Sequence, residues 1–143
     1  MAEKATIARP YARAAFEHAA ERHALAAWSE LLAVGAAVAA APGTASLFGN
    51  PRVTPDELVG LITAVAAESG VTVTPDAQSF LGVLAHEHRL ALLPEIAVQY
   101  EARRAEAENT IDVEVTTAMP LTAEQRAMLA AALGQRFGRT VRL

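Results

Sequence analysis

The segment His86-Glu87-His88 is the part of this 143-residue sequence that comes closest to a metal site. Imidazole and carboxylate groups are common ligands of metal ions in proteins. On an α-helix, however, residues two apart point roughly 200° away from each other, so the two imidazoles could not bind one ion. On a strand they could, but the segment follows a typical helix start at Thr74-Pro75. Surface or interface histidines are therefore the favoured interpretation, and a small metalloenzyme using these three residues is the weaker alternative.

The sequence contains no other recognisable catalytic or cofactor signature. Its lack of cysteine excludes a disulfide framework, a thiolate metal site and a cysteine nucleophile. The glycines form neither G-x-G-x-x-G nor G-x-x-x-x-G-K-[ST], and neither G-x-S-x-G nor H-E-x-x-H occurs. Glu17 and Glu21 lie four residues apart on a polar helix face, where carboxylates are ordinarily solvated. We therefore predict a protein that is not an enzyme, with no catalytic residue, cofactor or metal.

The charge distribution restricts the class of partner. The formal net charge is -4, and basic residues are not interleaved with aromatic ones, so nucleic acid is a poor candidate. Residues 126–143 nevertheless contain four arginines and no acid, a local bias that could meet an acidic partner: Arg126, Arg136, Arg139 and Arg142.

Neither a membrane span nor a signal peptide is predicted. The longest uncharged apolar run extends from Leu31 to Ala41, about half of the ~20 residues that a spanning helix needs. The N-terminus lacks a basic region followed by an apolar one. We therefore expect a soluble, intracellular chain.

The composition predicts helices with a thin core. Hydrophobic residues make up 52% of the chain, 34 residues are Ala, and only 5% are aromatic. Ala has the highest intrinsic helix propensity, and its small side chain leaves Leu and Val to fill the space between helices. The length suits one ordinary domain or two small ones.

Apolar residues at helical spacing predict successive helices over residues 1–105. Threonine N-caps, Thr-Pro pairs, glycines and prolines set the expected bounds. The predicted elements are a helix capped by Thr6 that ends near Arg22, a helix from Leu25 to Ala41, a loose segment from Thr44 to Asn50, a helix from Thr54-Pro55 to Ser69-Gly70, a helix that begins at Thr74-Pro75, a break from Arg89 to Leu93, and a helix from Pro94 to Ala107.

From Thr110 the apolar period changes to two. Ile111, Val113, Val115 and Thr117 alternate with polar residues, which predicts a half-buried strand. A capping signature at Thr122 predicts a helix that ends at Gly138, and residues 139–143 alternate again. This strand-helix-strand fragment is too short to bury its own faces. The predicted class is therefore mainly α, with a helical domain at 1–105 and an incomplete α+β domain at 106–143.

Two of the predicted helices have a second stripe of small or apolar residues beside the stripe expected in the core. These stripes are Ile7, Tyr11, Ala14 and His18 in the first helix, and Ser79, Gly82, Val83 and His86 in the helix that begins at Pro75. Side by side, the stripes would form a shallow groove for an amphipathic helix of another protein. The alternative, that both stripes belong to the core, stays open on periodicity alone.

Three segments resemble one family in order and spacing along the chain. Residues 8–16 resemble its opening pattern A-x-x-Y-A-x-A-L/A-F, residues 80–100 include Leu93-Pro94-Glu95-Ile96, and Val113 to Leu121 resembles the start of its second domain. The family is the δ subunit of bacterial F-type ATP synthase, whose mitochondrial relative is the oligomycin-sensitivity-conferring protein.

The resemblance implies a non-catalytic stator subunit that links the catalytic head to the peripheral stalk for proton-driven ATP synthesis. An N-terminal six-helix bundle would bind the N-terminal helix of an α subunit between its first and fifth helices. Tyr11 and Val83 are the foremost groove residues, and the other stripe residues follow. The second domain would contact the b subunits of the stalk. The complex would lie at the cytoplasmic face of the bacterial inner membrane, which this subunit would meet only indirectly.

The sequence also departs from the family pattern. Family members continue past the second strand with a Gly-rich segment, further strands and a terminal helix, so we expect this chain to be C-terminally truncated and its stalk attachment to be affected. An unrelated helical adaptor is the alternative function.

Overall fold

The computed structural model describes residues 2–112 and 115–142. Helices dominate these residues, so the prediction of a mainly α protein is confirmed. The chain divides into two compact units, residues 1–102 and 103–143. No helix within the described residues is long and apolar enough to cross a bilayer.

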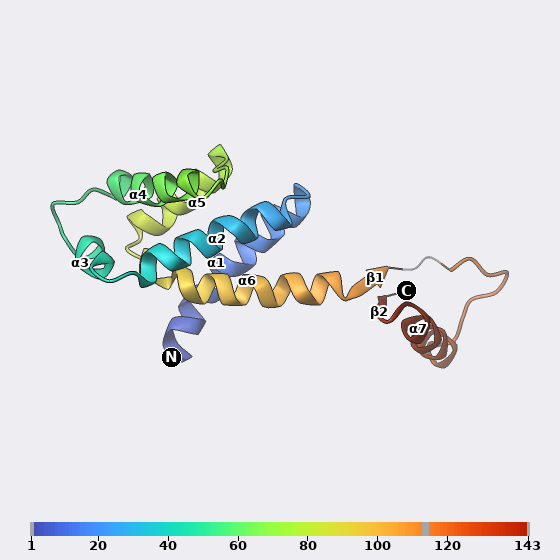
Figure 1. Ribbon diagram of the computed structural model, residues 1–143. Helices are drawn as coiled ribbons and strands as arrows, with labels where there is room; N and C mark the ends of the chain where they lie inside the picture. Colours follow the sequence, from blue (N-terminus) through green and yellow to red (C-terminus); the bar gives the residue numbers. More distant parts are fainter. Residues whose placement is uncertain (1, 113–114, 143) are drawn as a thin grey trace. The chain divides into compact units, whose positions relative to one another are not determined.

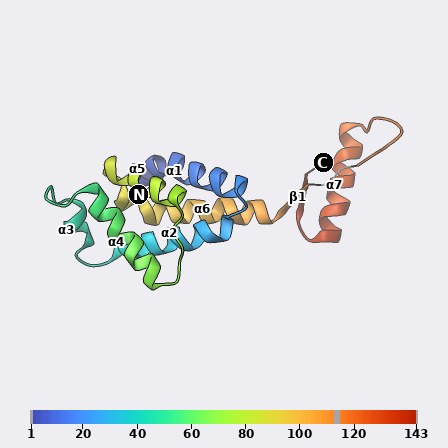
Figure 2. The same ribbon diagram turned by 90° about the horizontal axis from the view of Figure 1, so that it is seen from above.

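The first unit consists of packed helices with short connections (Figure 1). In chain order its elements are α1 (Ala2–Glu21), α2 (Leu25–Ala40), α3 (Thr44–Phe48), α4 (Pro55–Glu68), α5 (Pro75–His86), the 3-10 turn η1 (Leu90–Leu92) and the greater part of α6 (Leu93–Glu108). Both views show α4 beside α5 and α1 beside α2 (Figure 2).

The core of this unit sets small side chains of α1 against large side chains from the other helices. The buried face of α1 consists of Ala8, Ala12, Ala15 and Ala19, all on one side of the helix. They pack in one cluster with Trp28, Leu31, Leu32, Ile62, Leu81, Leu84, Leu93, Ile96 and Tyr100. Because alanine leaves so little bulk between helices, α1 lies close to its neighbours.

The starts of α4, α5 and α7 follow the predicted capping chemistry. The Thr54 hydroxyl accepts a hydrogen bond from the backbone N–H of Glu57 at 3.2 Å, and Thr74 accepts one from Ala77 at 3.3 Å. In the second unit Thr122 and Gln125 form a complete reciprocal capping box. These local signals placed the helix starts correctly.

Two predictions for the first unit were wrong. The first helix begins at Ala2 and not at Thr6, because the residues before Thr6 are good helix formers and Glu3 lies favourably in the first turn. The segment from Thr44 is a short helix, α3, and not a loose connection. Gly43, with a φ of 85°, turns the chain into it, and Phe48 packs against the core.

The second unit contains two short parallel strands joined through α7 (Ala123–Phe137). Strand β1 spans Thr110–Asp112 and pairs with β2, Thr140–Arg142. Residues 115–117 are not in a strand, contrary to prediction. The predicted strand residue Val113 and the terminal Leu143 lie outside the described residues. No described residue of α7 is buried, and Met128 and Phe137 are exposed.

Candidate functional site

The stripe that we predicted on α1 is partly uncovered. Ile7 is 37% exposed, and Ala14 is exposed. Tyr11 and His18 are half-buried, and Tyr11 packs against the core. The buried alanines occupy the neighbouring side of the same helix. Part of this stripe therefore lies on the surface, and part of it borders the core.

The stripe on α5 is also uncovered. Val83 is 53% exposed, Ser79 and His86 are exposed, and Gly82 is half-buried. A Cβ atom added to Gly82 would meet no atom within 4 Å. This side of α5 is thus open along its length, opposite the side that holds Leu81 and Leu84 in the core.

Polar contacts join α1 to α5 at the C-terminal end of α1. His18 Nε2 lies 3.3 Å from Asp76 Oδ2, and Arg22 Nη1 lies 3.4 Å from the same oxygen. The His18 ring also meets the Trp28 ring edge-on at 5.4 Å, and Trp28 meets Phe80 at 5.5 Å. Three helices are therefore tied together at this end by one cluster of side chains.

A second contact joins the two helices at the other end. The guanidinium of Arg89, three residues after the end of α5, donates a hydrogen bond to the Tyr11 hydroxyl at 2.5 Å and lies 5.5 Å from the centre of that ring. The later residue of α1, His18, meets the start of α5, and the earlier residue, Tyr11, meets its end. The two helices therefore run antiparallel. Along the helices, some residues of the open stripes lie between these two contacts and the others lie beyond them.

The structure brings some of the predicted residues together and leaves others apart. His18 meets Asp76 at the start of α5, and Tyr11 meets Arg89 just beyond its end. Val83 lies on the same face of α5 as Asp76, because residues seven apart share a helical face. Among the described residues, no hydrogen bond or ion pair joins Ser79 or His86 to α1. Those residues lie on the outward side of α5.

Helical periodicity does not reveal the two residues that meet α1, Asp76 and Arg89, or the contact of Phe80 with Trp28 of α2. Arg89 lies in the predicted break, where periodicity gives no orientation. The only signal in the sequence is charge: the anionic Asp76 lies at the start of α5, and the cationic Arg89 lies just after its end.

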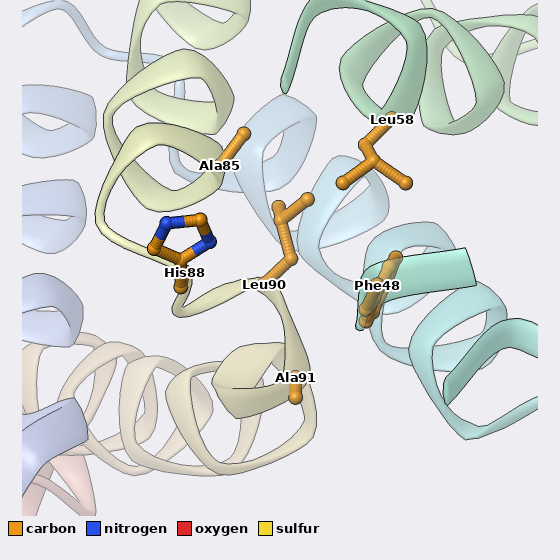
Figure 3. Close-up of a pocket in the computed structure, with 6 residues that line it drawn as sticks. All are labelled: Phe48, Leu58, Ala85, His88, Leu90 and Ala91. Carbon is orange, nitrogen blue, oxygen red and sulfur yellow. The ribbon is translucent and has the colours of Figure 1, made fainter. Parts of the chain in front are cut away.

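The histidines of the His86-Glu87-His88 segment face different surroundings. His88, with a φ of 57°, lines a cavity of about 40 Å³ together with apolar side chains such as Phe48, Leu58 and Leu90 (Figure 3). The cavity adjoins an open hollow of about 700 Å³ beside the start of α4. No group of three His, Asp or Glu side chains that could hold a metal occurs among the described residues.

The paired carboxylates of α1 have no acid–base arrangement. Glu17 accepts a hydrogen bond from Arg13 Nε at 2.9 Å on the exposed side of the helix. This hydrogen bond raises the pKa of Arg13 above its ordinary value. Glu21 is exposed. The uncovered stripes of α1 and α5 are suited to recognising a surface of another molecule.

Comparison with known proteins agrees with this assessment. Residues 7–143 match the family described as ATP synthase delta (OSCP) subunit. The ATP synthase subunit delta of Alkalilimnicola ehrlichii is 46% identical over 143 residues, which cover 100% of this chain and 79% of that protein. That of Xanthomonas campestris pv. campestris is 48% identical over 141 residues, or 99% of this chain and 77% of the relative. The delta subunit is a structural, peripheral and non-catalytic part of ATP synthase. The chain therefore belongs to the ATP synthase delta (OSCP) subunit family.

Proposed function

We propose that this chain is a stator subunit that holds the catalytic head of ATP synthase to the peripheral stalk by binding the N-terminal helix of an α subunit along α1 and α5. The observation that supports this most directly is the uncovered stripe on each helix. Ile7 and Val83 are large apolar side chains that a folded protein ordinarily buries, and they flank a surface whose two ends are fixed by polar contacts.

The energetics of such a contact suit a stator. Rotation of the central rotor exerts torque on the head, so the attachment must persist over many turns. A helix seated on apolar stripes buries ~1,200–2,000 Å² in total, the range of stable and specific complexes. The small residues Ala14, Ser79 and Gly82 would let the backbone of the partner helix approach closely.

The domain roles that we propose follow the family. Residues 1–105 form a six-helix bundle that binds the head, and residues 106–143 belong to an α+β domain directed at the b subunits of the stalk. The arginines at 126, 136 and 139 give that part a basic surface for an acidic partner. The assembly lies at the cytoplasmic face of the bacterial inner membrane, where this subunit contacts the membrane only through the complex.

Isothermal titration calorimetry with a synthetic α-subunit N-terminal peptide tests the proposal. We expect tight binding by the unmodified chain and a loss of at least tenfold for Val83→Asp, because a carboxylate would be buried against apolar side chains. Val98→Asp is the matched control, since Val98 is 67% exposed on α6, away from the stripes. It should bind as the unmodified chain does.

Two outcomes contradict the proposal. If the unmodified chain does not bind the peptide, the protein is better described as an unrelated helical adaptor. If both aspartate variants lose affinity equally while remaining folded by circular dichroism, the peptide binds elsewhere.

A further inference from the structure

Arg89 is placed beside the proposed groove by the way α5 ends. His88 adopts a left-handed backbone conformation with a φ of 57°, and the N–H of Arg89 then donates a hydrogen bond to the carbonyl of Leu84 at 2.7 Å. This closure ends α5 and turns the chain into η1. The backbone geometry at the end of α5 therefore fixes the position of Arg89 independently of its side-chain contacts.

The Arg89 side chain is held by an aromatic ring. Its Nη1 donates to the Tyr11 hydroxyl, and its guanidinium carbon lies 5.5 Å from the ring centre. The residue is half-buried. A guanidinium fixed in this way loses little further conformational freedom when it binds a ligand.

Arg89 differs from the other paired arginines in its partner. Arg13, Arg22 and Arg104 each lie within ion-pair distance of a carboxylate, at 2.8 to 3.4 Å. Within residues 2–112 and 115–142, no carboxylate lies that close to Arg89. A guanidinium has five N–H donors in a fixed fork, and a phenol oxygen occupies one. The remaining donors match the two oxygens of a carboxylate.

The two ends of the proposed groove are therefore electrostatically different. At the far end, Asp76 already has Arg22 within ion-pair distance and His18 within hydrogen-bond distance. At the near end, Arg89 presents positive charge beside Tyr11. Seven residues of α1 separate Tyr11 from His18, about 10 Å along the helix. An arriving helix would meet one cation without a carboxylate partner, at one end only.

We propose that Arg89 binds a carboxylate side chain of the partner helix, and that this pair sets which way round that helix lies. The inference rests on the proposed function and adds the chemistry of the partner: an amphipathic helix with an Asp or Glu bordering its apolar face, at the end that meets Tyr11. Tyr11 is then a positioning residue for Arg89 as well as an apolar contact.

A charge-swap titration on the full chain tests the proposal. The probe is the N-terminal helix peptide of the α subunit of Alkalilimnicola ehrlichii, in which each Asp or Glu is replaced in turn by Asn or Gln. Arg89→Gln should weaken binding roughly tenfold, as expected when a hydrogen bond between charged groups is lost. One peptide variant, in which the carboxylate that pairs with Arg89 is replaced, should bind the unmodified chain with the same loss of affinity. Arg89→Gln should bind this variant no more weakly than it binds the original peptide.

Salt dependence and a matched control separate this role from a structural one. Binding by the unmodified chain should weaken as NaCl is raised, and binding by Arg89→Gln should respond less. Arg9→Gln is the control, because Arg9 is exposed on the opposite flank of α1. Arg89→Lys keeps the positive charge but lacks the forked N–H donors of a guanidinium. Its affinity for the peptide should lie between those of the unmodified chain and Arg89→Gln.

The outcomes distinguish the two proposals. If the unmodified chain binds no peptide, the proposed function fails, and this inference with it. If the chain binds, but Arg89→Gln is folded and binds as Arg9→Gln does, or no acidic position of the peptide is coupled to Arg89, this inference alone is overturned.

Discussion

Replacing Gly82 by Ala should stabilise the free protein and, at the same time, weaken its binding to the partner helix. Gly82 lies in the interior of α5, where glycine is unfavourable because it loses more backbone freedom on folding than any other residue. An added Cβ would meet nothing within 4 Å. The full propensity gain is therefore available, an increase of about 0.5–1 kcal/mol in the free energy of unfolding.

In the complex the same methyl group has a different environment. If the partner helix lies across the stripe of α5, its backbone occupies the space that is open in the free protein. A methyl group inserted into a close helix contact costs about 1–3 kcal/mol. The peptide should then bind roughly 5- to 150-fold more weakly to Gly82→Ala than to the unmodified chain.

Gly60→Ala provides the matched control. Gly60 lies in the interior of α4, and a Cβ there also meets nothing within 4 Å. It should raise stability by the same amount and leave binding unchanged. Urea unfolding measures the first quantity and calorimetry with the α peptide measures the second.

Either measurement can refute the reasoning. Equal affinity of the two variants for the peptide would show that Gly82 is not covered by the partner helix. A lower stability of Gly82→Ala in the absence of peptide would show that the space beside it is already occupied.

Two further predictions concern the two units separately. Gly35→Ala should destabilise the first unit by about 1–3 kcal/mol in urea unfolding, since the new Cβ would lie 3.1 Å from Cδ1 of the fully buried Leu93; unchanged stability would mean that this side chain can move aside. Thr122→Ala should cost about 1 kcal/mol through loss of the capping box, visible as reduced helix content of α7, whereas Thr122→Ser should retain it.

Features set by neighbouring residues were predictable from the sequence. Thr54 and Thr74 were identified as N-caps because a cap needs only the next three residues, and the structure has both bonds. Helical spacing of apolar residues likewise predicted the helix from Leu25, and its leucines Leu31 and Leu32 are buried.

Features set by distant residues were not predictable. The residues of β1 pair with residues of β2 that lie 30 positions later in the chain. Asp76 meets His18 across 58 positions, and Arg89 meets Tyr11 across 78. No local pattern in the sequence encodes such pairs, so the groove's two stripes could be predicted but not the contacts that fix its ends.

Those end contacts bear on how the proposed groove could hold a partner under torque. A binding surface formed by two helices must keep their separation constant, or part of the binding energy is used to restore it. The cluster of His18, Asp76 and Trp28 fixes one end, and the pair of Tyr11 and Arg89 fixes the other. Between them the stripe residues are small or uncovered, while the buried faces of α1 and α5 pack in the same apolar core. Such a surface is already formed before the partner arrives, which favours slow dissociation over rapid exchange.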